Sequence, residues 1–145
     1  MVDFDRSVLG VESTPIRYDV EKGAIRQFVE AIGDEDPIYR DEQAAQAAGF
    51  KTIVAPPTFL CLFRAQELPD LKIAFGRVRL NGGNAYEYHQ PVYAGDTITV
   101  TAKYADVTER TGRTGSMVFV FTDLTFTNQH GEVVATGRNT GIMRE

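Results

Sequence analysis

The order of hydrophobic and polar residues divides the chain into a helical first half and a strand-rich second half. Residues 15–20 alternate between polar and apolar positions, which predicts a short strand. Over residues 22–32 the apolar positions recur at helical spacing, which predicts a helix. We expect Asp19 to cap the start of this helix and Gly33 to end it.

Two further helices are predicted in the first half. Residues 40–49 form a short alanine-rich segment with acidic residues at its start and a glycine at its end. Residues 57–67 begin with Pro57, which suits the first position of a helix, and are apolar on nearly every face. Such a helix is usually buried in the middle of a fold. Cys61 within it is therefore expected to be a small core residue.

From residue 77 onward the pattern has a period of two, which is typical of strands. Helices followed by a run of antiparallel strands are the order of an α+β fold. The buried helix suggests a sheet wrapped around it, in a single domain that spans residues 1–145. The predicted strands lie near residues 77–91, 96–109, 115–128 and 132–143, with turns between them.

Composition narrows the function classes. Fifteen basic residues against 20 acidic ones give a net charge of −5, which argues against a nucleic-acid binder. From its early acidic residues we expect the N-terminus not to be a secretory signal, and no run reaches the ~18 apolar residues of a membrane span. The lone Cys61 suits a reducing compartment, so we expect a cytoplasmic protein. With only two isolated histidines, His89 and His130, no metal site is expected.

The segment GDEDPIYRD, residues 33–41, is the main candidate for chemistry. Clustered aspartates beside a proline ordinarily form a turn that caps a helix. The alternative is a functional site formed by Asp34, Asp36 and Tyr39. The segment IVAPPTF favours it, because the start of a buried helix there exposes backbone amides and the positive end of the helix dipole. The pair Gly82 and Gly83 indicates a bulge or close backbone approach, or a contact with a ligand that lies along the strand.

Two separated motifs resemble MaoC-like hydratases and dehydratases. FVEAIGDEDPIYRDEQAAQAAGFKTIVAPPTF resembles the N-terminal segment of that family, and YEYHQPVYAGDTITV resembles its strand ending in PV, two residues and GD. The resemblance implies a hot-dog fold, in which an antiparallel sheet wraps around a long central helix. It also implies a dimer with another hot-dog subunit, acyl thioesters of coenzyme A or acyl carrier protein as substrates, and no cofactor.

The sequence departs from the family pattern at two important places. Active members carry D-x-N-P-x-H, where Asp and His share a water molecule; here Asp34 matches the aspartate and Tyr39 replaces the histidine. Tyrosine, with an ordinary pKa of ~10 against ~6.5 for histidine, is a poor base at neutral pH. Pro57 replaces the glycine whose N–H stabilises the developing oxyanion, and proline has no N–H.

These departures favour a substrate-binding role over turnover. The resemblance then implies the acyl-binding subunit of an (R)-specific enoyl thioester hydratase or (3R)-hydroxyacyl thioester dehydratase, paired with a catalytic subunit. Two alternatives stay open: a self-sufficient homodimeric enoyl-CoA hydratase that uses Asp34 with Tyr39 or His89, and a non-catalytic acyl-CoA binder. The residues implied to bind substrate are Ile53, Ala55, Pro56, Pro57, Thr58, Gly82, Gly83 and Asn84.

Overall fold

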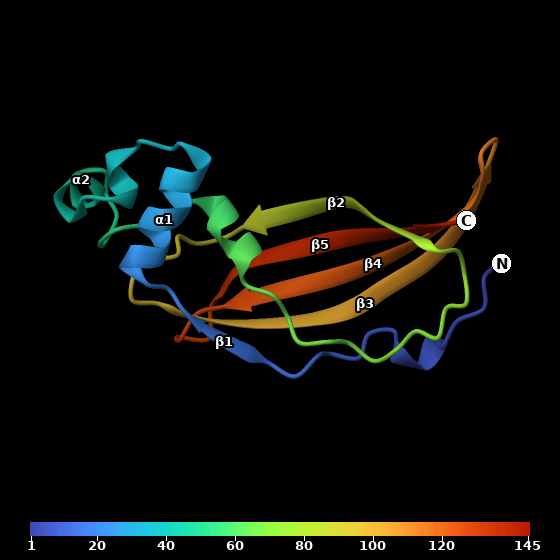
Figure 1. Cartoon of the computed structure of the whole chain (residues 1–145). Coiled ribbons are helices and arrows are strands. Elements are labelled where there is room, and N and C mark those ends of the chain that lie inside the picture. Colours follow the sequence, from blue (N-terminus) through green and yellow to red (C-terminus); the bar gives the residue numbers. More distant parts are fainter.

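A computed structural model describes all 145 residues and shows a long antiparallel sheet with the helices gathered at one end (Figure 1). Both chain termini lie at the opposite end of the sheet. In chain order the elements are a 3-10 helix η1 (Arg6–Val8), β1 (Ile16–Asp19), α1 (Lys22–Ile32), a 3-10 helix η2 (Pro37–Tyr39), α2 (Glu42–Ala47), a 3-10 helix η3 (Pro57–Leu62), β2 (Val78–Tyr88), β3 (Thr97–Gly112), β4 (Gly115–Thr127) and β5 (Val133–Arg144).

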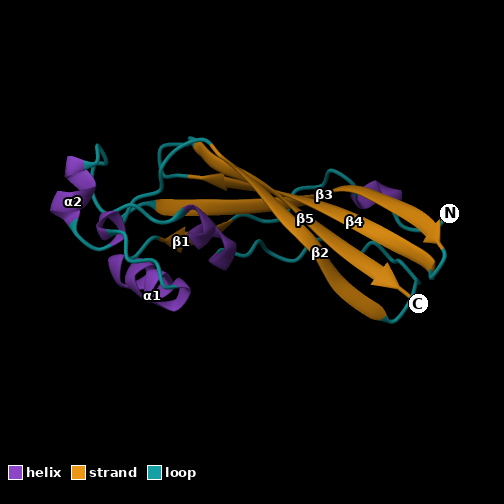
Figure 2. Cartoon of the chain, turned by 90° about the horizontal axis from the view of Figure 1, so that it is seen from above, coloured by secondary structure: helices purple, strands orange, loops and turns teal.

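The five strands form one sheet in the order β1-β3-β4-β5-β2, with every neighbouring pair antiparallel. The sheet twists strongly along its length, as Figure 2 shows. β2 forms one edge, pairs only with β5, and is exposed along almost all of its 11 residues. The predicted α+β order and the four long strands are confirmed, with boundaries that differ by at most a few residues.

Helix α1 packs against one face of the sheet, which we call the inner face. Its side chains Ile25 and Val29 are fully buried there. Gly33 ends the helix as predicted, with φ at 70°, and donates its N–H to the carbonyls of the last turn. The predicted cap is wrong: Asp19 lies in β1 and pairs with Thr97, while Glu21 occupies the capping position without a side-chain hydrogen bond.

The predicted buried helix over residues 57–67 is also wrong. The chain forms only the short η3, and residues 63–76 belong to no helix or strand. Phe63 stacks on Tyr18 of β1 with ring centroids 4.6 Å apart, and the Tyr18 hydroxyl donates to the Arg64 carbonyl at 2.7 Å. These contacts hold the start of the segment after η3 against β1. The helix against the sheet is therefore α1, and Cys61 is exposed, not a core residue.

The apolar core consists of two separate clusters on the inner face. The larger one holds 14 buried residues, including Val100 and Phe126, and lies under α1 and η3. The smaller one holds five buried residues, including Phe4, Leu71 and Val118, at the end of the sheet where the chain termini lie. No helix of the structure is both long and apolar enough to cross a membrane.

Candidate functional site

The acidic loop after α1 is held by its own carboxylates. Asp34 Oδ1 accepts a hydrogen bond from the backbone N–H of Asp36 at 3.0 Å. Asp36 Oδ1 in turn accepts from the N–H of Ile38 at 3.1 Å and caps η2. Arg40 donates to the Asp34 backbone carbonyl at 2.7 Å. The turn-and-cap interpretation is therefore confirmed, since Asp34 holds the turn and Asp36 caps η2. Asp34 keeps one carboxylate oxygen outside these bonds.

Tyr39 is half-buried at the end of η2. Burial raises the pKa of its hydroxyl above the ordinary value, and the negative charges of Asp34 and Asp36 raise it further. The phenol is therefore neutral over the physiological range. A neutral phenol donates or accepts a hydrogen bond, but it cannot take a proton from water as a histidine does.

Removal of one neighbouring charge provides a test of this electrostatic arrangement. We expect Asp34→Asn to lower the pKa of Tyr39 toward its ordinary value, because one of the two negative charges that oppose phenolate formation is lost. The burial of Tyr39 is unchanged in this variant, so the pKa of its hydroxyl stays above the ordinary value. Ultraviolet difference titration, with Tyr39→Phe as the reference that removes this signal, measures the shift. A Tyr39 signal unaffected by Asp34→Asn would contradict the arrangement.

Tyr39 and Pro57 meet at one cavity of about 350 Å³. The segment 54–57 forms part of the cavity wall. Within it, Ala55 donates its N–H to the Val92 carbonyl at 2.8 Å, so this amide is already occupied. Neither Pro56 nor Pro57 has an N–H to offer. The cavity walls are mainly apolar: Ile38, Tyr39, Phe50, Val54, Ala55, Pro56, Pro57, Leu60, Tyr88, His89, Gln90, Pro91 and Val92.

The other residues implied by the resemblance lie in different surroundings. Ile53 is buried in the larger core cluster, and Thr58 is exposed at the start of η3. Gly82 lies at a bulge in β2, where a side chain would collide with Ile142, whose nearest atom is 2.7 Å away. Gly83 has φ at 143° and open space beside it. Asn84 lines a second cavity on the inner face.

The structure adds residues that the motifs did not single out. Tyr88, at the end of β2, joins His89 in the wall of the first cavity, and its ring stacks on Tyr86 with centroids 6.1 Å apart. Phe50 reaches the same cavity from the segment after α2 and lies edge-on to Tyr93. The alternation in YEYH placed Tyr86 and Tyr88 on one face, so this signal was present in the sequence.

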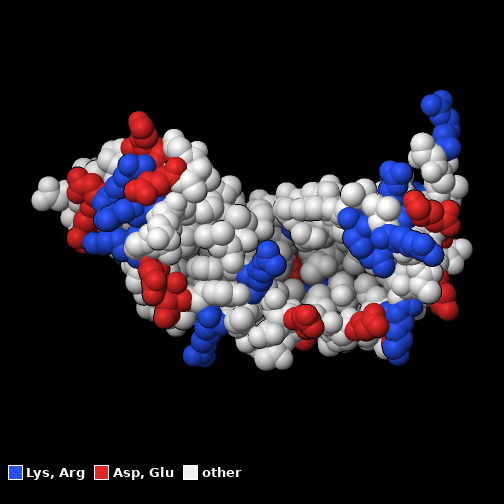
Figure 3. Space-filling model, in the orientation of Figure 1, with Lys and Arg blue, Asp and Glu red and all other residues white.

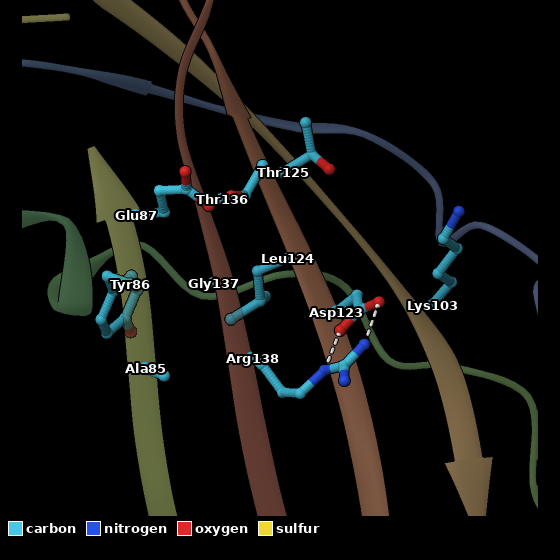
Figure 4. A pocket seen from close by; sticks show the side chains of 10 residues that line it. All are labelled: Ala85, Tyr86, Glu87, Lys103, Asp123, Leu124, Thr125, Thr136, Gly137 and Arg138. Carbon is cyan, nitrogen blue, oxygen red and sulfur yellow. Dashed lines mark hydrogen bonds and ion pairs between the residues drawn. The ribbon is translucent and has the colours of Figure 1, made fainter. Parts of the chain in front are cut away.

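A hollow of about 580 Å³ lies on the opposite, outer face of the sheet, around Asp123 and Arg138 (Figure 4). Two of its charged side chains satisfy each other, since Arg138 donates two hydrogen bonds to Asp123 at 2.7 and 3.0 Å. This pairing lowers the pKa of the Asp123 carboxyl. We interpret this hollow as a solvated strand surface. No cluster of three or more His, Cys, Asp or Glu side chains able to hold a metal ion is present.

Comparison with known sequences places these features in context. The family model for the FAS1-like, dehydratase domain region matches residues 7–137. A UPF0336 protein from Saccharopolyspora erythraea is 34% identical, covering 97% of this chain and 91% of that protein. A probable enoyl-CoA hydratase alpha subunit from Thermomonospora curvata is 32% identical, covering 79% of this chain but only 41% of that protein.

Solved structures show the same architecture. The ChsH1-ChsH2 complex from Mycobacterium tuberculosis contains a chain that superposes with a TM-score of 0.81 at 24% identity, covering 93% of this chain and 89% of that one. The HadBC (3R-hydroxyacyl-ACP dehydratase) complex from the same organism gives 0.73 at 26% identity, covering 93% and 96%. These likenesses confirm the hot-dog fold that the sequence indicates.

Proposed function

The chain belongs to the FAS1-like dehydratase-domain family, among the MaoC-like hydratases and dehydratases that its motifs indicate, and from this we propose that it is the acyl-thioester-binding subunit of a two-subunit hydratase or dehydratase. One observation carries the proposal. Tyr39 and Pro57, which replace the family's base and oxyanion donor, line the same apolar cavity. The cavity therefore keeps the shape for a substrate where the groups that convert it are missing.

The free edge of the sheet supports a second subunit as partner. β2 offers unpaired backbone groups along one side, and its exposed side chains include Val78, Leu80 and Tyr88. Such an edge is a ready template for pairing with another strand. Both solved relatives described above are two-subunit complexes. The partner would supply the aspartate, histidine and glycine that act on the thioester.

Kinetics with and without a catalytic subunit test this proposal. We expect the purified chain to bind medium-chain acyl-CoA without hydrating crotonyl-CoA or longer enoyl-CoAs. Mixed with a MaoC-like subunit that carries D-x-N-P-x-H and the helix-start glycine, it should give an active complex of both chains by size-exclusion chromatography. Turnover by the chain alone at the rate of ordinary hydratases would contradict the proposal.

One observation favours the self-sufficient homodimer as a second candidate function. His89 lines the same cavity as Tyr39, so a basic side chain is present after all. In this alternative His89 takes the proton and the Tyr39 hydroxyl donates one. His89→Ala would then abolish whatever hydration the chain alone shows, and an undiminished rate would exclude this histidine.

A further inference from the structure

A row of polar side chains crosses the inner face of the sheet. The strand registers pair Tyr104 with Thr122, Thr122 with Asn139, and Asn139 with Asn84. The row therefore spans β3, β4, β5 and β2. Successive residues of a strand alternate between faces, so Thr122 points to the same side as the buried Phe126, four positions along β4. This side of a sheet is ordinarily apolar.

The row lies between the two apolar clusters of the core and lines a cavity of about 470 Å³. The segment after η3 forms the other wall, through residues such as Phe63, Arg64 and Leu68. In the space-filling view the surface is hollowed between the helical end and the opposite end of the molecule, and charged side chains gather mainly at those two ends (Figure 3).

The polar groups of this row keep hydrogen-bonding capacity for a ligand. Asn139 donates its side-chain amide to the Asn84 side-chain oxygen at 2.5 Å, which is the one hydrogen bond between side chains of the row. Burial, with the charge of Asp70 second, raises the pKa of the Tyr104 hydroxyl, so this group stays protonated. The Thr122 hydroxyl both donates and accepts. On the outer face, by contrast, Asp123 and Arg138 satisfy each other.

The two cavities lie along the same side of β2. Tyr88 lines the cavity at Pro57, Tyr86 lines the second cavity, and Asn84 follows two residues further. The Tyr86 ring lies over Gly137, whose missing side chain leaves room for it: a Cβ there would stand 3.0 Å from the ring. Tyr88 and Asn84 are four positions apart on the strand, which corresponds to ~13 Å. An acyl chain that starts at Pro57 and follows this side of β2 past Tyr86 would reach the polar row.

We propose that the row Tyr104–Thr122–Asn139–Asn84 selects acyl chains that carry an oxygen substituent, a hydroxyl best, at the end that reaches the second cavity. The inference rests on the proposed acyl-binding function and specifies its substrate class. A hydroxyl both donates and accepts, which matches the mixture of amide and hydroxyl groups in the row. A plain alkyl chain would leave these groups without partners, and that penalty discriminates against it.

Equilibrium binding of a matched ligand pair tests the selection. Decanoyl-CoA and its terminally hydroxylated analogue are titrated into the full chain. We expect the hydroxylated ligand to bind about tenfold more tightly, the effect of one or two net hydrogen bonds. Thr122→Val and Asn139→Leu are each expected to remove this preference while keeping or improving the affinity for decanoyl-CoA. Thr125→Val, on the outer face of the same strand, is the matched control and should keep it.

The outcomes separate the two proposals. Equal affinity for the two ligands, or a preference that survives both inner-face substitutions, overturns the selection and leaves acyl binding intact. Binding of neither ligand by the unchanged chain overturns the acyl-binding function and the selection together. If one inner-face variant fails to fold, the other decides the result, because the two residues lie on different strands.

Discussion

The double substitution Tyr39→His with Pro57→Gly is expected to raise the rate of enoyl-CoA hydration at least ~10²-fold above that of the unchanged chain. The histidine would stand in the cavity beside the Asp34 loop, where it can take the proton that the neutral phenol cannot. The glycine would free a backbone N–H at the start of η3 for the thioester oxygen. General bases contribute ~10²–10⁴ and single oxyanion donors ~10²–10³.

Each single substitution serves as a control. Residues that act as one unit are strongly non-additive, so we expect Tyr39→His or Pro57→Gly alone to give a small part of the gain. Steady-state hydration of crotonyl-CoA, followed by loss of enoyl absorbance, measures all three variants. A folded double variant that still binds acyl-CoA but hydrates no faster would show that these two replacements do not account for the missing activity.

Phe59→Ala is expected to lower the free energy of unfolding by ~3–5 kcal/mol. The Phe59 ring is 1% exposed and lies edge-on to Phe28 of α1 at 5.6 Å and to Phe63 at 5.3 Å. Its removal opens a void between α1, η3 and the sheet that rigid neighbours cannot fill. Because Phe59 holds η3 in place, the cavity at Pro57 should lose its shape, and acyl-CoA affinity should fall with stability.

Leu62→Ala is the matched control for this effect, since Leu62 belongs to the same 3-10 helix but is 51% exposed. We expect it to cost no more than about 1 kcal/mol. Urea denaturation followed by circular dichroism compares the two variants. An equal loss in both would mean that η3 is not anchored by the Phe59 ring.

The strands were predictable because their signal is local. Alternation of apolar and polar residues from residue 77 onward follows directly from one face packing on a core, and tight turns with glycine separate the segments. The observed β2 to β5 accordingly match the predicted ranges. Gly33 as the end of α1 was equally local, since a left-handed residue there favours glycine.

The segment after Pro57 could not be predicted from its own residues. Its composition favours a helix, and the contacts that prevent one come from Tyr18, about 45 positions earlier in the chain. The same limitation affected Cys61, whose burial was inferred from a helix that does not form. Tertiary contacts of this kind override helix propensity, which is a weak preference.

The candidate site was predictable where motifs carried it. The two departures, at Tyr39 and Pro57, were identified in the sequence, and the structure brings both to one cavity. The polar row on the inner face was not predictable, because it depends on the register between four strands. Asn84 alone was singled out, for its place beside two glycines, whereas Thr122 and Asn139 read as ordinary residues of half-buried strands.

The exposed edge strand β2 affects how stable a newly made copy of the chain is in a cell. If the chain pairs through β2 as proposed, a copy synthesised without its partner would display 11 residues of open strand with few charged side chains to keep other strands away. Such an orphan subunit is prone to aggregate and is a natural target for chaperones and proteases. The amount of this chain that accumulates would then follow the supply of the subunit that covers β2, which keeps the two chains in balance without dedicated control of their synthesis.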